Sequence, residues 1–261
     1  MKKSLALIAI LSASAALADD PTPTVSANVY GVLRVETSAE EAIIAVPWLE
    51  PSVDGSAIAV TNVIKTANLT AGDELYYYDL QAKSYKAWKL NAEKKWESPT
   101  MVSVSGAVAG SDQTLLRGNA LLLKRPTAET RASAIYLLGQ VAASATAEVT
   151  MAQGTESAPA YTLLAPPAAA DTDLNDANAV VWSGVNVGDS IVLNDMTMLN
   201  WDAENGRWGR KISEKVGKVW QTTYDASKAV ILAGQGAWYV SAPGATAAPS
   251  ATWKALPSVG E

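Results

Sequence analysis

The sequence predicts an all-β protein made of two tandem, homologous β-sandwich or β-barrel-like units. Short apolar runs alternate with Gly, Pro, Asn or Asp along most of the chain, a pattern typical of many short strands. Landmarks of the first half recur in the second half, which predicts a duplicated architecture. Long segments with helical periodicity are scarce, although Thr127–Ser133 and Asp225–Ala229 are both candidates for single helical turns.

The clearest sign of the repeat is a pair of Gly-Asp turns, each followed at the same distance by a glycine within an apolar run. Gly72 and Gly118 are 46 residues apart (118 − 72 = 46), and so are Gly188 and Gly234 (234 − 188 = 46). An aromatic hairpin follows each turn. In the second copy Asn205-Gly206 predicts a two-residue type I′ turn, because both residue types tolerate positive φ.

Related short runs open, divide and close the expected pair of units. They lie at Val29–Val35, Ile135–Val141 and Thr252–Leu256, and the middle run could be shared or act as a hinge. The predicted division is a signal peptide at residues 1–18, an extended leader at residues 19–28, a first β unit at residues 29–134 and a second at residues 135–261.

The first 18 residues have the features of a cleaved signal peptide. Lys2 and Lys3 precede the apolar run Leu5–Leu11, and Ala16-Leu17-Ala18 fits the small-x-small cleavage rule. This run is too short for a membrane span, which takes roughly 20 apolar residues, and no other run approaches that length. We therefore expect export to the periplasm, the cell surface or the medium, with no membrane span.

Charge and composition exclude several classes of function. Without Lys2 and Lys3 the chain has 18 basic and 26 acidic residues, a net charge of −8 (20 − 2 = 18; 18 − 26 = −8). An acidic chain repels phosphate backbones, so nucleic acid is not expected as a partner. The partly basic stretch Arg207–Lys218 is interpreted as a solvated face, and short strands are expected at Arg207–Ile212 and Val219–Tyr224.

The chain contains no histidine and no cysteine. This excludes Ser-His-Asp and Cys-His nucleophilic sites, and metal sites built from His or Cys ligands. We expect no cofactor and no resident metal. Gly188-Asp189-Ser190-Ile191 has the letters of a GDSL esterase block, but that chemistry needs a histidine base. We interpret it, like its counterpart at Gly72-Asp73, as a β-turn whose aspartate accepts hydrogen bonds from nearby backbone N–H groups.

Two further candidate sites, one catalytic and one for calcium, would depend on carboxylate side chains. A glycosidase needs only a pair of acids, and Asp79, Asp195, Asp202 and Glu204 lie beside aromatic residues, but acids at strand ends are mostly turn formers. Asp171–Asn178 resembles the start of a calcium loop, yet lacks the glycine and glutamate of an EF-hand. Two interpretations of this segment are retained: an Asx-rich turn and a looser calcium-binding loop.

Four tryptophans are the candidate binding residues. Trp88, Trp96, Trp201 and Trp208 lie in the aromatic hairpins and could stack on sugar rings. The alternative is that they pair across strands and fill a core. Because neighbouring residues on a strand face opposite sides, Tyr76 and Tyr77 cannot both point inward.

The succession of Gly188-Asp189, a Tyr/Trp hairpin and Gly234–Tyr239 (Gly-Gln-Gly-Ala-Trp-Tyr) resembles a family of secreted, β-rich bacterial proteins of verrucomicrobial type with no assigned role. The first half departs from this pattern, with Arg117–Leu121 reading Arg-Gly-Asn-Ala-Leu. The resemblance implies an exported β protein and brings no catalytic residues.

From these observations we expect an exported, non-catalytic structural or interaction protein of the cell envelope or exterior, with a protein or glycan as its partner. The alternative is a pair of carbohydrate-binding modules that use Trp and Tyr platforms.

Overall fold

The computed structural model describes residues 30–37, 40–45, 64, 68–79, 84–97, 120–125, 134–140, 146–167 and 169–254. The predicted signal peptide, the leader and the candidate helical turn at Thr127–Ser133 lie outside the described residues. Within them the fold is all-β, as predicted, and contains no α-helix. No helix there is long and apolar enough to cross a membrane. The other candidate helical turn is η4 (Ala226–Lys228), capped by Asp225, which accepts a hydrogen bond from the Ser227 N–H.

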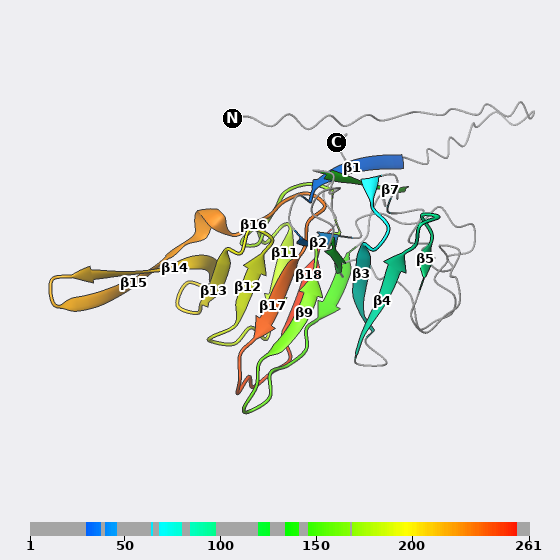
Figure 1. The fold of residues 1–261 in the computed structure, drawn as a ribbon. Helices are drawn as coiled ribbons and strands as arrows, with labels where there is room; N and C mark the ends of the chain where they lie inside the picture. Colours follow the sequence, from blue (N-terminus) through cyan, green and yellow to red (C-terminus); the bar gives the residue numbers. More distant parts are fainter. Residues whose placement is uncertain are drawn as a thin grey trace, which may run out of the picture.

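The first half of the chain builds an antiparallel five-stranded sheet in the order β2-β6-β3-β4-β5. Strands β3, β4 and β5 of this sheet lie side by side in Figure 1. Its strands are β2 (Glu41–Ala45), β6 (Ala120–Lys124), β3 (Glu74–Asp79), β4 (Ser84–Leu90) and β5 (Trp96–Glu97). Strands β2 and β6 are apolar nearly throughout and are buried on both faces, which is typical of strands with a core on each side.

The second half builds an antiparallel six-stranded sheet in the order β9-β17-β12-β13-β14-β15. Its strands are β9 (Ala160–Leu164), β17 (Ala237–Ser241), β12 (Ser190–Leu193), β13 (Met198–Asp202), β14 (Arg207–Val216) and β15 (Val219–Asp225). Burial alternates along β17, because one face of this strand packs on the core and the other is partly open.

The two sheets have the same strand order when strands are matched in chain order. The strand order β2-β6-β3-β4-β5 of the first sheet corresponds to β9-β17-β12-β13-β14 in the second. Strand β15 is an additional strand at the outer edge of the second sheet. Strands β3 and β12 begin 116 residues apart (190 − 74 = 116), which is also the spacing of Gly72 and Gly188 (188 − 72 = 116).

Three smaller groups of strands complete the fold. They are the pair β1 (Tyr30–Glu36) and β7 (Ala134–Gln140), the pair β10 (Thr172–Asp173) and β16 (Val230–Ile231), and the sheet β11 (Val180–Ser183), β18 (Ser250–Trp253) and β8 (Ala147–Thr150). Strand β7 pairs with β1 at seven positions, so it lies with the N-terminal strand and not with the second half.

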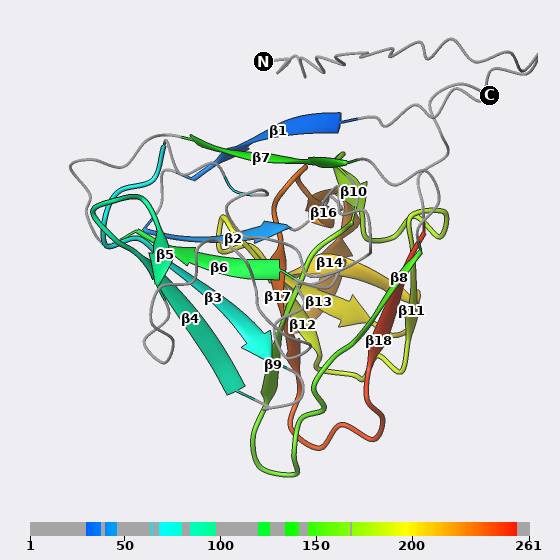
Figure 2. The same cartoon turned by 90° about the vertical axis from the view of Figure 1, so that its right-hand side faces the viewer.

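Each large sheet packs its inner face against one of the smaller groups (Figure 2). The first core joins Leu33 of β1 and Leu137 of β7 to Leu75 and Leu123 of the five-stranded sheet. The second core joins β8, β11 and β18 to the six-stranded sheet in the same way. Each half is therefore a small two-layer structure with its own apolar core.

A third apolar cluster connects the two halves. It joins Ile43 and Leu122, on the outer face of the five-stranded sheet, to Leu163 of β9. The side chain of Asn194 completes the contact: its Oδ1 accepts a hydrogen bond from the Ile43 N–H (2.7 Å), and its Nδ2 donates to the Ile43 carbonyl (2.8 Å). A side-chain amide thus pairs with the outer edge of β2 as a neighbouring strand would.

The Gly234-Gln235-Gly236 segment runs along the same edge of β2. The Ala45 N–H donates to the Gly234 carbonyl (2.8 Å), and the Gly236 N–H donates to the Ile43 carbonyl (2.9 Å). A Cβ at Gly236 would lie 2.7 Å from the Ala120 Cβ, the Ile43 Cγ2 and the Leu164 carbonyl oxygen. The glycine is required there because two sheets meet at its backbone.

The two Gly-Asp turns have matching local geometry, as expected. The Thr70 N–H donates to Asp73 Oδ2 and the Asn186 N–H donates to Asp189 Oδ2, each at 2.8 Å. Both aspartates are buried. The sequence Gly188-Asp189-Ser190-Ile191 is therefore a structural turn that leads into β12.

The predicted hairpin at Asn205-Gly206 is present, but the prediction of a two-residue type I′ turn is wrong. Asp202 pairs with Arg207, which leaves a four-residue loop, and Asn205 is not among the residues with positive φ. The Asp202 carboxylate accepts hydrogen bonds from the Asn205 N–H (3.3 Å) and Nδ2 (2.8 Å). These hydrogen bonds from Asn205 to the Asp202 carboxylate stabilise the four-residue loop. The residue types Asn205-Gly206 by themselves predict the shorter turn and not this loop.

Candidate functional site

The four tryptophans predicted as binding residues lie mostly inside the protein. Trp88, Trp96 and Trp208 are 3%, 1% and 0% exposed, and Trp201 is half-buried against the second core. Trp88 stacks on the buried ring of Tyr77 at 4.5 Å. Buried rings cannot stack on a sugar, so Trp88, Trp96 and Trp208 fill cores.

An aromatic cluster forms the centre of the second core. Trp208 contacts Trp182, Trp201 and Tyr239 edge to face, with ring centroids 5.1–5.9 Å apart. Edge-to-face contacts place the positive edge of one ring against the negative face of the next, which stabilises the cluster beyond the burial of its area. The aromatic residues of the second hairpin therefore serve packing.

Two of the candidate catalytic acids, Asp202 and Asp195, have partners close to them in the chain. Asp202 is held by Asn205 and Arg207, and Asp195 accepts a hydrogen bond from the Thr197 N–H (2.9 Å) within its own turn. Asp79 ends β3 in a pairing with Ser84, and Glu204 lies in the exposed loop between β13 and β14. These interactions are those of turn formers.

The Asp171–Asn178 loop, considered for calcium, uses its carboxylates for backbone contacts. Asp173 Oδ1 accepts from the Asn175 N–H, and Asp176 Oδ1 accepts from the Asn178 N–H, both at 2.8 Å. These are Asx turns. Within the described residues no group of three or more acidic side chains is arranged to hold a metal ion.

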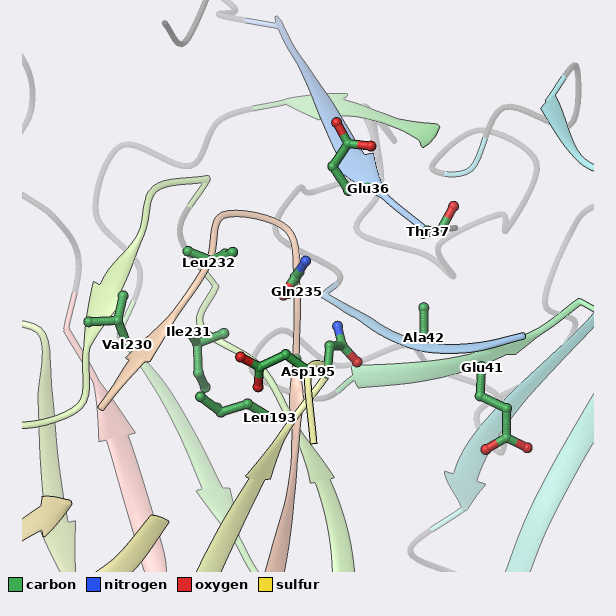
Figure 3. Close-up of a pocket in the computed structure, with 12 residues that line it drawn as sticks. Glu36, Thr37, Glu41, Ala42, Leu193, Asp195, Val230, Ile231, Leu232 and Gln235 are labelled. Carbon is green, nitrogen blue, oxygen red and sulfur yellow. The ribbon is translucent and has the colours of Figure 1, made fainter. Parts of the chain in front are cut away.

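A cavity of about 250 Å³ lies where the two halves meet, between β2, the end of β1 and the turn after β12 (Figure 3). Glu36, Glu41 and Asp195 line it, and their carboxylates point in different directions. Glu41 is paired with Lys124 (2.8 Å), and Glu36 is paired with Arg34. Among the described residues that line the cavity, Glu36, Glu41 and Asp195 do not form the converging carboxylate pair that hydrolysis of a glycoside requires.

The most exposed part of the described structure is the hairpin formed by β14 and β15, which projects from the body (Figure 1). From Ser213 to Thr223 every side chain is exposed, so both faces of this ribbon meet solvent. Val216, Val219 and Trp220 at its tip are 54%, 64% and 68% exposed. Large apolar side chains clustered at an exposed tip are typical of an interaction surface.

The two strands of the hairpin differ in their side chains. Arg210, Lys211 and Lys215 give β14 a basic character, whereas β15 has no charged residue between Val219 and Tyr224. On one face Lys215 pairs with Trp220 and Lys211 pairs with Tyr224. The edge strand is therefore the neutral, aromatic half of the ribbon.

The sequence prediction found only part of this hairpin. It placed strands at Arg207–Ile212 and Val219–Tyr224 and interpreted the residues between them as a solvated face. The structure extends β14 to Val216 and closes the ribbon with a turn at Gly217-Lys218. Gly217 has φ +65° while Lys218 is not in the positive-φ region, which fits a type II′ turn with glycine at its first central position. The pair Gly217-Lys218 between two β-branched valines was the sequence signal for this turn.

Comparison of the chain with protein-family models, with curated proteins and with solved structures finds no match.

Proposed function

We propose that this chain is an exported, non-catalytic structural or interaction protein of the cell envelope or exterior, and that it makes contact through the β14–β15 hairpin. The observation that carries the proposal is the projecting ribbon with Trp220 68% exposed at its tip. A tryptophan side chain has few rotatable bonds and loses little conformational entropy on binding, which suits Trp220 as an anchor.

The residue composition supports the same proposal. The chain has no histidine or cysteine, which nucleophilic sites of the Ser-His-Asp and Cys-His kinds require, and Asp195 and Asp202 have partners within their own turns. The burial of Trp88, Trp96 and Trp208 argues against the alternative function as carbohydrate-binding modules, since those rings would form its platforms.

We further propose that the chain consists of two copies of one β unit. The shared strand order and the 116-residue spacing support this, and so do the closing strands: β7 and β18 also begin 116 residues apart (250 − 134 = 116). Because β7 pairs with β1, a boundary after Gln140 fits the pairing better than one before Ile135.

The role of the hairpin can be tested by sedimenting the purified protein with cell envelopes of its native host. Trp220→Ser combined with Val219→Ser is expected to lower the bound fraction about tenfold or more, since interface aromatics dominate binding energies. The matched control is Val187→Ser, which removes an even more exposed valine (79%) from a turn elsewhere. Equal binding of both variants and the unaltered protein would contradict the proposal.

A further inference from the structure

The two large sheets have four outer strands, and three of these edges are protected. β2 is covered by Asn194 and by Gly234–Gly236, and β9 packs against β6 and β3. β5 has only two residues. Proteins protect sheet edges in such ways because unpaired backbone groups are templates for another strand.

The fourth edge, β15, has none of these protections within the described residues. Strand β15 pairs only with β14 and is seven residues long. From Val219 to Tyr224 it carries no charge, proline or glycine, and β-branched and aromatic residues with high strand propensity predominate. An isolated two-stranded ribbon is marginally stable in water, and a third strand stabilises it.

The hairpin turn determines which backbone groups of β15 face outward. Val216 pairs with Val219 across the two-residue turn. In a turn of this kind the N–H of the fourth residue donates to the carbonyl of the first, so the backbone N–H and C=O groups of Val219 and of every second residue after it point toward β14. The N–H and C=O groups of Trp220, Thr222 and Tyr224 therefore point away from the sheet.

We propose that β15 pairs antiparallel with β15 of a second copy of this chain, about a two-fold axis through Thr222. Outward-facing residues must oppose outward-facing residues in such a pairing. A two-fold axis through Thr222 pairs all three outward-facing residues. Trp220 opposes Tyr224 of the second copy, and Thr222 opposes Thr222 of the second copy. Shifting the register by two residues loses one of these pairs.

This register also matches the side chains. Aromatic–aromatic and Thr–Thr pairs are both favourable across antiparallel strands, and no two like charges oppose one another. The result is a continuous sheet running through both copies, joined by an isologous contact. The inference rests on the proposed function, because it assigns the partner of the same hairpin.

Cysteine cross-linking tests the register directly, because the chain has no native cysteine. Thr222→Cys is expected to give a disulfide-linked dimer under mild oxidation, since opposed residues have Cα atoms about 5.5 Å apart. Thr223→Cys, the adjacent control, opposes Gln221 of the second copy, and its own counterpart lies beyond the reach of about 7 Å. Equal cross-linking of the two variants, or none in either, would overturn the proposal.

A second measurement does not depend on cysteine. Sedimentation velocity over a concentration series is expected to show a dimer for the unaltered protein and at least a tenfold weaker dimer for Thr222→Pro, which removes outward N–H groups at the axis. A monomer at all concentrations whose envelope binding still depends on Trp220 would refute self-pairing and leave the proposed function standing. A monomer that binds envelopes regardless of Trp220 would refute both.

Discussion

Two buried aspartates show how the same turn is stabilised by different partners. Asp73 lies 3.4 Å from the guanidinium of Arg125, which is fully buried. Asp189 is held instead by neutral donors: the Tyr239 hydroxyl donates to Oδ2 (2.6 Å) and the Ala242 N–H donates to Oδ1 (2.7 Å). Burial, with this hydrogen bond to Asp189, strongly raises the pKa of Tyr239, so the phenol remains a donor at all physiological pH values.

Asp189→Ala is expected to destabilise the protein by at least about 2 kcal/mol, because each buried donor left unpaired costs about 1–3 kcal/mol. Tyr239→Phe removes one donor and leaves the other contacts of Asp189 intact, so it should cost about 1 kcal/mol. Urea unfolding of both variants measures the difference. A larger loss in Tyr239→Phe would place the stabilisation in the tyrosine and not in the turn.

Gly236→Ala is expected to destabilise the protein by about 1–3 kcal/mol, since the new methyl group would be forced against Ala120, Ile43 and Leu164. Gly217→Ala is the contrast, because its Cβ would meet nothing within 4 Å and only the left-handed φ of +65° opposes it. Thermal unfolding should show a lower melting temperature for Gly236→Ala and a changed turn for Gly217→Ala. Equal stability of Gly236→Ala and the unaltered protein would refute the close approach.

At the level of elements, the hairpin depends on which N–H groups face β14. Thr223→Pro removes an inward N–H and should open the ribbon, whereas Thr222→Pro removes an outward N–H that an edge strand can lose. Amide exchange at Ile212, the cross-strand partner of Thr223, is expected to accelerate at least tenfold in Thr223→Pro only. Acceleration in both variants would contradict the assigned direction of the N–H groups.

The loop between β13 and β14 gives a pH dependence. Hydrogen bonds from the Asn205 side chain, and less strongly from Arg207, lower the pKa of Asp202 in the folded protein. A lowered folded-state pKa adds stability above the ordinary aspartate value of about 4, and this stability is lost as the pH falls through the folded pKa. Asp202→Asn should therefore flatten the decline in stability below about pH 4.

The measurement for Asp202 is the unfolding midpoint as a function of pH in the unaltered protein and in the variant. Glu204→Gln, in the same loop but exposed, is the control and should leave the acid profile unchanged. An identical decline in Asp202→Asn would show that other carboxylates govern it.

At the level of the whole molecule, the Asn194 side chain makes polar contacts that join the two halves. Asn194→Ala leaves the Ile43 N–H without its partner and should cost about 1–3 kcal/mol. Asp195→Ala, the adjacent residue, loses only a contact within its own turn. Calorimetry should show a single transition in the unaltered protein and a lower, broader one in Asn194→Ala. An unchanged transition would mean that the apolar cluster alone joins the halves.

Much of the β architecture could be predicted from local sequence. The Gly-Asp turns, the strand starts at Arg207 and Val219 and the turn at η4 follow from residues adjacent in the chain, whose preferences act over a few positions. The length of the Asp202–Arg207 loop was mispredicted because a side-chain cap competes with the turn preference of Asn-Gly.

The exposure of tryptophans could not be predicted in the same way, since identical residue patterns occur on core faces and on open faces. Trp96 and Trp208 are buried because each lies under a second layer of strands contributed by distant segments. Trp220, not singled out by sequence reasoning, is exposed because β15 extends beyond the layer that covers its neighbours.

The sequence by itself determined the strand-rich class, the positions of the tight turns and the lack of His and Cys chemistry, because these depend on residue type and on short-range backbone preference. Only the tertiary structure decided which edge of which sheet is left open, which aromatic rings are buried and how Gly234–Gly236 joins the halves. Those features depend on contacts between segments tens of residues apart, and local sequence does not encode which surface will cover which.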